Sequence, residues 1–150
     1  MIVRSLFVFI ALASAVLCVC AQEAPKKPNQ PSSRVVTASQ VNGVYRYYKN
    51  EFRILALGNN KLKVQFDGVY MTASGTHNLG TASGEASIEG NVAKFKPSDT
   101  DHCEITLIFS NKLRVTQEGS DADCGFGHNV IADGTYRKIR GGKPKFESGP

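Results

Sequence analysis

Apolar and polar residues alternate with a period of two through most of the stretch 41–139. The clearest run is 61–67, where Leu62, Val64 and Phe66 share one side of an extended chain. Such alternation is typical of a β-strand with one buried face, because successive side chains of a strand point to opposite sides. No part of the stretch carries an apolar stripe with the period of an amphipathic helix. The pattern therefore predicts an all-β domain.

Turn-forming residues separate the alternating runs at 58–60, 90–91 and 110–111. Connections this short favour antiparallel hairpins over helical crossovers between parallel strands. Runs and turns of this length leave room for about eight strands. The sequence thus predicts an antiparallel meander in which each strand pairs with the next.

A short motif near the start of this stretch returns near its end. Gly43-Val44-Tyr45-Arg46 is echoed by Gly134-Thr135-Tyr136-Arg137. If the first and last strands pair, the meander closes into a barrel and loses its exposed edges. We predict a barrel-like meander on this ground. A chance repeat, with an open coiled sheet or a sandwich, fits the same alternation.

The first 21 residues have the three-part pattern of a cleaved signal peptide. Arg4 makes the start positive, 6–19 is apolar, and the small residue Ala21 precedes the expected cut. The apolar run has 14 residues, short of the roughly 20 that a membrane-spanning helix needs. We therefore expect a secreted or periplasmic protein. Lipidation at Cys20 is the alternative that would tether it to a membrane, although the residues before Cys20 fit a lipoprotein signal poorly.

Removal of residues 1–21 leaves two cysteines, Cys103 and Cys124. Two cysteines in an exported domain most often form a disulfide. Neither belongs to a CxxC pair, so a reactive thiol or a metal site is disfavoured. Twenty residues separate the cysteines, and closing such a loop stabilises a fold by about 3 kcal/mol.

Composition divides the remaining chain into three parts. Residues 22–40 are rich in Pro, Ser and Lys and predict a flexible N-terminal segment, 41–139 form the β domain, and 140–150 predict a flexible basic tail. The whole chain has a net charge of +5. Residues 41–136 hold nine basic and eleven acidic side chains, a net charge of −2. The positive charge therefore belongs to the ends of the chain.

Two acidic clusters surround the two cysteines. A Cys103–Cys124 bridge would gather their carboxylates at one end of the domain and attract a basic partner. Solvated acidic loops without a partner are the plainer interpretation. The candidate partner-binding residues are Asp99, Asp101, Glu104, Glu118, Asp121 and Asp123.

The sequence offers little for catalysis or metal binding. Its three histidines are scattered over predicted loops, and no HExxH, GxSxG or phosphate-loop motif occurs. Asp99, Asp101 and Glu104 lack the spacing of a calcium-binding EF-hand. We expect no enzyme, no cofactor and no metal site. The basic tails have only one interleaved aromatic residue, Phe146, so nucleic acid is not an expected partner either.

The stretch 103–139 combines a strand that begins with Cys, a Val-x-Gln strand, the turn Cys124-Gly125-Phe126-Gly127 and a closing Gly-x-Tyr. It resembles a C-terminal pattern of small exported bacterial proteins of unknown function, and 80–95 fits the same pattern. Similar segments accompany lysozyme inhibitors of the LprI type. The helical, cysteine-bearing N-terminal module of that group is absent here. The resemblance implies an exported β domain and assigns no functional residue.

These observations favour a monomeric binding module, with a basic extracellular enzyme such as lysozyme as the partner. A carrier of a small apolar ligand is the first alternative, because Ala82, Gly84 and Ala86 leave little side-chain bulk on one side of their strand. A structural envelope or surface protein without a ligand is the second. The interior of the barrel discriminates between them: a deep apolar pocket favours the carrier, and a filled core favours recognition at the surface.

Overall fold

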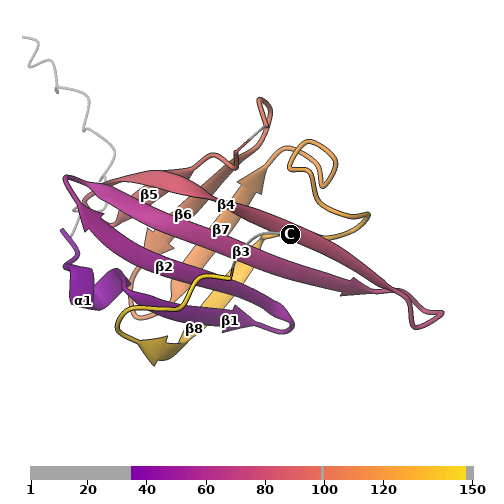
Figure 1. Ribbon diagram of the computed structural model, residues 1–150, viewed down its shortest axis with the longest axis horizontal. Helices are drawn as coiled ribbons and strands as arrows, with labels where there is room; N and C mark the ends of the chain where they lie inside the picture. Colours follow the sequence, from indigo (N-terminus) through magenta and orange to yellow (C-terminus); the bar gives the residue numbers. More distant parts are fainter. Residues whose placement is uncertain (1–34, 99, 148–150) are drawn as a thin grey trace, which may run out of the picture. The chain divides into compact units, whose positions relative to one another are not determined.

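The computed structural model describes residues 35–98 and 100–147. Eight β-strands pair antiparallel in chain order and close into a barrel (Figure 1). The predicted all-β fold, the meander and its closure are therefore confirmed, and the open sheet and the sandwich are excluded. The elements are α1 (Ala38–Val41), β1 (Gly43–Tyr47), β2 (Asn50–Gly58), β3 (Lys61–Met71), β4 (His77–Glu89), β5 (Val92–Phe95), β6 (Glu104–Phe109), β7 (Leu113–Glu118) and β8 (Gly134–Gly141).

Consecutive connections of the meander lie at opposite ends of the barrel (Figure 1). The turns after β2, β4 and β6 lie at one end, together with α1, and we call this the turn end. The connections after β1, β3, β5 and β7 lie at the other, which we call the loop end. The loops 96–103 and 119–133 make the loop end the more elaborate of the two.

The alternation places apolar side chains inside the barrel as expected. Leu62, Val64 and Phe66 of β3 are buried, as are Ile105 and Leu107 of β6. The polar residues between them face outward, and of those on β3 Gln65 alone is buried. Burial of one face is what holds each strand in register, because a slip by one residue would turn its apolar set toward water.

Pairing of β1 with β8 closes the barrel and explains the echoed motif. Gly43 lies opposite Gly141, and a Cβ at Gly43 would be 2.3 Å from the carbonyl oxygen of Arg140. A bulkier residue at position 43 would therefore push the two strands apart. Arg46 lies opposite Arg137, so the two arginines of the motif are neighbours on the outer wall.

The two tyrosines of the motif donate equivalent hydrogen bonds at opposite ends of the barrel. Tyr45 Oη donates to the carbonyl of Val41, and Tyr136 Oη donates to the carbonyl of Ala132, both at 2.8 Å. Each tyrosine thus pins the segment that leads into its own strand. Burial of both rings raises their pKa values above the ordinary range, so both hydroxyls stay protonated.

Aromatic rings fill the barrel toward the loop end. The ring centroids of Phe52 and Phe66 are 4.8 Å apart, those of Phe52 and Tyr136 are 5.0 Å apart, and those of Phe66 and Phe126 are 5.1 Å apart. Phe126 comes from the loop 119–133, so this chain of rings joins the barrel wall to the loop. All of these side chains are buried.

A pair of glycines makes room for the loop. Gly68 of β3 lies opposite Gly80 of β4. A Cβ at Gly68 would lie 2.7 Å from Val130 Cγ1, and a Cβ at Gly80 would lie 2.9 Å from Phe126 Cβ. Because both positions lack side chains, Phe126 and Val130 close the loop end as a plug. Gly80 of β4 therefore serves close packing here.

The turn end is covered by α1, which the sequence pattern did not predict. Thr37 and Gln40 form a capping box, and Val41 is buried in the core. Residues 38–40 of this helix belong to the segment that the sequence predicted to be flexible, and here they form a capped helical turn. The rest of that segment up to residue 34, the signal peptide and Cys20 lie outside the described residues.

The predicted flexible tail is also different in the structure. Strand β8 runs to Gly141, two residues beyond the predicted end of the domain. Beyond it the chain lies against β2 and β3: Glu147 pairs with Arg53 at 2.8 Å, and its backbone exchanges two hydrogen bonds with the Gln65 side chain. This contact explains why Gln65, on the outer face of β3, is only 6% exposed.

No helix in the described part of the chain is long and apolar enough to cross a membrane.

Candidate binding surface at the loop end

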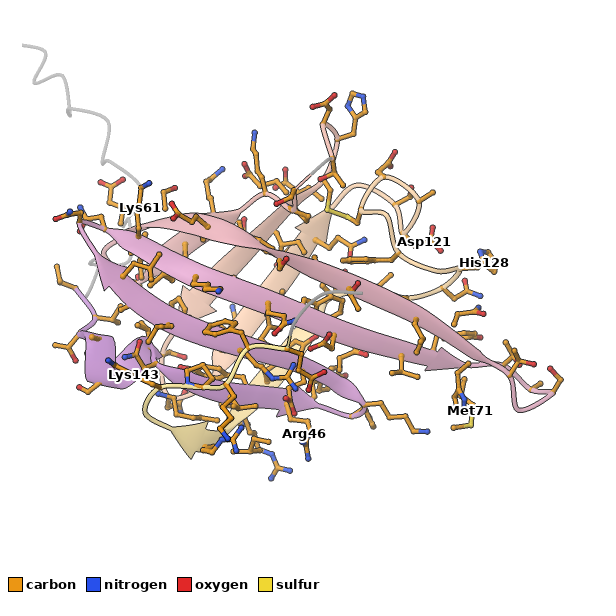
Figure 2. The ribbon with its side chains drawn as sticks, in the orientation of Figure 1. Arg46, Lys61, Met71, Asp121, His128 and Lys143 are labelled. Atoms are coloured by element: carbon orange, nitrogen blue, oxygen red, sulfur yellow. A yellow bond between two sulfur atoms is a disulfide. The ribbon has the colours of Figure 1, made fainter. Side chains whose placement is uncertain are left out.

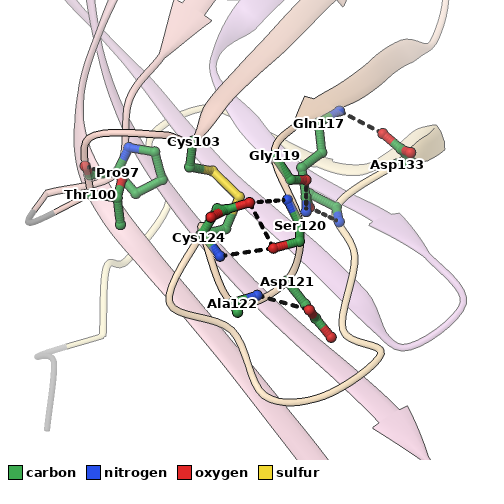
Figure 3. The surroundings of a disulfide bond; sticks show 12 residues. Pro97, Thr100, Cys103, Gln117, Gly119, Ser120, Asp121, Ala122, Cys124 and Asp133 are labelled. Carbon is green, nitrogen blue, oxygen red and sulfur yellow. Dashed lines mark hydrogen bonds between the residues drawn. A yellow bond between two sulfur atoms is a disulfide. The ribbon is translucent and has the colours of Figure 1, made fainter.

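The predicted disulfide joins the two long loops of the loop end (Figure 3). Cys103 and Cys124 are bonded, with their Cα atoms 4.9 Å apart, and both are buried. The bond ties the loop 119–133 to the start of β6. A disulfide of this kind is compatible with a protein outside the cytosol.

Hydrogen bonds fix the loop around Cys124 (Figure 3). The Asp123 carboxylate accepts from the backbone N–H of Ser120 at 2.8 Å and from its hydroxyl at 2.7 Å. The Asp121 carboxylate accepts from the backbone N–H groups of Ala122 at 2.8 Å and Asn129 at 2.6 Å. These bonds hold the loop in one shape without a partner.

Two asparagine side chains tie the loop to the barrel. Asn50 donates to the carbonyl of Ile131 at 2.9 Å and accepts from the N–H of Val69 at 3.0 Å. Asn78 donates to the carbonyl of His128 at 2.7 Å. The loop 119–133 is therefore fixed on two sides as well as by the disulfide.

The structure separates the predicted acidic residues by environment. Glu104 and Glu118 lie directly opposite each other on β6 and β7, and Glu104 pairs with Lys94 at 2.5 Å. Asp121 and Asp123 belong to the hydrogen-bonded loop, and Asp101 is exposed in the loop before β6. Asp99 lies outside the described residues. The loop end thus gathers these carboxylates, and their contact with a partner stays a prediction.

The bonds within the loop set the charge state of two aspartates. Hydrogen bonds from the backbone lower the pKa of Asp121, and His128 lies 3.6 Å from its carboxylate (Figure 2). Hydrogen bonds from Ser120 lower the pKa of Asp123. Both groups therefore remain ionised at pH values where an ordinary aspartate begins to bind a proton.

We expect Asp123→Asn to lower the melting temperature at neutral pH and to lose this effect in acid. A carboxylate whose folded-state pKa is depressed stabilises the fold above its unfolded pKa, 3.8, and this stabilisation disappears as the pH falls through the folded pKa. Thermal unfolding from pH 7 to pH 2 measures the difference. Asp101→Asn is the matched control, because Asp101 has no hydrogen bond to any described residue. If the difference in melting temperature between the wild type and Asp123→Asn stays constant down to pH 2, the Asp123 carboxylate is not the stabilising group.

Sequence reasoning missed an exposed group of tyrosines beside the loop. Tyr47, Tyr48, Tyr70 and Ile131 border an open hollow of about 610 Å³ at the loop end, and we call them the tyrosine patch. Tyr48 is 83% exposed and has a φ of 50°. A bulky residue with positive φ is strained, and Tyr48 takes this φ at the first position of the two-residue turn between β1 and β2. Two adjacent tyrosines at the end of a predicted strand were the available signal, since both cannot face the core.

The patch rests on a glycine. A Cβ at Gly134 would lie 2.5 Å from Tyr47 Cδ1, so the ring of Tyr47 lies directly on the backbone of β8. Its ring centroid is 4.6 Å from that of Tyr48. Tyr47 therefore supports the exposed Tyr48 from below.

Residues 35–98 and 100–147 hold no cluster of three potential metal ligands. Comparison with known proteins returns no match to a family model, a curated protein or a solved structure.

Proposed function

We propose that the domain is an exported protein-recognition module that binds a basic extracellular enzyme of the lysozyme class through its loop end. One observation carries the proposal: the described residues of the two long loops there bear four acidic side chains against one lysine, Lys96, and the tyrosine patch lies beside them. The described acids of these loops are Asp101, Asp121, Asp123 and Asp133. An acidic surface speeds encounter with a basic partner, and exposed tyrosines supply contact area at low entropic cost.

The rigidity of the loop end supports the same proposal. The disulfide and the bonds of Asp121 and Asp123 set the shape of the loop before a partner arrives. Preorganisation of this kind lowers the entropy that binding costs. The packed rings of Phe52, Phe66 and Phe126 support action at the surface over carriage of a ligand inside the barrel.

The choice of partner class rests on the charge of the loop end and on the resemblance of 103–139 to segments of LprI-type proteins. Lysozymes are small, basic and extracellular, which makes them chemically complementary to this surface. The proposed action is steric: the bound domain obstructs the enzyme and performs no reaction of its own.

Titration of the protein into a lysozyme assay at low salt tests the proposal. We expect micromolar or tighter binding that weakens as salt rises, together with inhibition. Tyr48→Asn should weaken binding about tenfold, the size expected for loss of one tyrosine anchor. Its melting temperature should stay equal or rise, because asparagine tolerates positive φ better than tyrosine does.

A pair of charge-matched double variants separates the loop end from net charge. Asp101→Asn with Glu118→Gln removes two exposed acids near the loops, and Glu85→Gln with Glu89→Gln removes two from β4 toward the turn end. Only the first pair should weaken binding. Absence of binding and inhibition by the wild-type protein at micromolar concentration overturns the proposal.

A further inference from the structure

The outer face of the barrel around β8 is positively charged. Arg46 of β1 lies directly opposite Arg137 of β8, and Arg114 of β7 lies opposite Thr135, two residues before Arg137. Lys112 immediately precedes β7. We call Arg46, Lys112, Arg114 and Arg137 the basic wall. Its cations come from both halves of the echoed motif and from the strand beside it.

Few acids balance this wall. Arg46 pairs with Glu51 at 2.7 Å, and Glu51 also pairs with Arg53 at 2.9 Å. Across 35–98 and 100–147, no carboxylate lies within 4.0 Å of the cationic groups of Lys112, Arg114 or Arg137. Like charges placed directly opposite on neighbouring strands destabilise a sheet. Repulsion between Arg46 and Arg137 therefore destabilises the unbound domain, and an anionic partner would relieve this repulsion.

Aromatic and apolar side chains stand among these cations. Tyr47, Tyr48, Thr135 and Ile139 border an open hollow of about 560 Å³ together with Arg46, Lys112 and Arg137. Tyr48 is 83% and Ile139 48% exposed. Tyrosine is enriched at the boundary between lipid and water, and basic side chains are attracted to anionic headgroups just above it.

We propose that the basic wall docks the domain on an anionic phospholipid surface, with a headgroup phosphate between Arg46 and Arg137 and with Tyr48 and Ile139 at headgroup depth. A planar guanidinium suits phosphate oxygens because it can donate two parallel hydrogen bonds, as Arg137 can here. Arg46 donates to Glu51 through Nε and Nη2 and keeps Nη1 for the same phosphate. The exposed Ile139 favours a lipid surface over a fully solvated polyanion, because a lipid surface has an apolar layer beneath its charge. The basic wall shares Tyr47 and Tyr48 with the tyrosine patch, but its four cations take no part in the proposed enzyme contact. The arginine variants therefore test this inference independently of the proposed enzyme partner.

Co-sedimentation of the full chain with vesicles tests the inference. The measured quantity is the ratio of partition constants for vesicles containing phosphatidylglycerol and vesicles of phosphatidylcholine alone. We expect the ratio to exceed tenfold at low salt. Arg46→Ala with Arg137→Ala should reduce it by about fivefold for each arginine. All variants share residues 1–34, so binding by that segment cancels in the comparison.

Lys61→Ala with Lys94→Ala is the matched control, because it removes the same charge from β3 and β5. Figure 2 shows Lys61 and Arg46 on well-separated parts of the barrel. This control should change the ratio less than threefold, and both double variants should melt within a few degrees of the wild type. Equal losses in the two variants, or no preference of the wild type for anionic vesicles, overturns the inference. Wall-dependent binding of heparin, or wall-dependent self-association against the acidic loops, in place of vesicle binding also overturns it.

Discussion

Replacing Cys103 and Cys124 with serine is expected to lower the melting temperature by about 10 to 25 °C. Opening a disulfide loop of this length costs about 3 kcal/mol, and 1 kcal/mol corresponds to roughly 4–8 °C in a domain of about 100 residues. The bond also holds the loop that carries Phe126, so its loss exposes part of the core. Circular dichroism during heating measures the change.

A reducing agent provides the control for this experiment. It should lower the melting temperature of the wild type toward that of the double serine variant and leave the variant unchanged. A wild type that melts at the same temperature with and without reductant, within about 3 °C, would show that the bond contributes little.

Phe66→Ala is expected to cost about 3–5 kcal/mol of unfolding free energy. Phe66 is fully buried and its ring contacts those of Phe52 and Phe126, so the substitution leaves a cavity between the wall and the plug. A domain of this size has a free energy of unfolding of only about 5–15 kcal/mol, so the variant loses a large part of its stability. Urea unfolding measures the loss as a shift of the midpoint.

Phe146→Ala makes the same chemical change outside the barrel. Phe146 is partly exposed and its ring lies 4.6 Å from Lys63 Nζ. We expect it to cost less than about 1 kcal/mol, in line with an exposed cation–π contact. Equal shifts for the two variants would mean that the rings inside the barrel do not dominate stability.

Local patterns in the sequence were enough for the strands, their inward faces and the disulfide. Alternation around Leu62 and Ile105 depends only on neighbours two residues away, and the two cysteines outside the expected signal peptide leave a single intramolecular pairing. The echoed motif pointed correctly to closure. The hydrogen bonds that Tyr45 and Tyr136 donate explain why the motif has a tyrosine in both copies, which the sequence alone did not show.

Features that depend on distant contacts could not be predicted in this way. Helix α1 has four residues, too few for any periodicity, and Val41 is buried only because the barrel end receives it. The tail is ordered by Gln65, 82 residues away from Glu147. A polar, proline-containing stretch gives no local sign of such a partner.

The candidate surface shows the same limit. Charge along the chain located the acidic loops, but the pairing of Glu104 with Lys94 and the internal bonds of Asp121 appear only in three dimensions. The tyrosine patch needs the closed barrel to bring Tyr48, Tyr70 and Ile131 together. These residues come from three segments that no sequence window contains.

Closure of β1 against β8 also sets the order in which the chain can fold. A polypeptide that emerges N-terminus first, from a ribosome or through a pore, offers β1 long before its second neighbour exists. Gly68 and Gly80 likewise gain their packing partners, Phe126 and Val130, only when the loop 119–133 has emerged. Contacts this distant in sequence form slowly. The closed barrel is therefore reached only after nearly the whole polypeptide has been delivered.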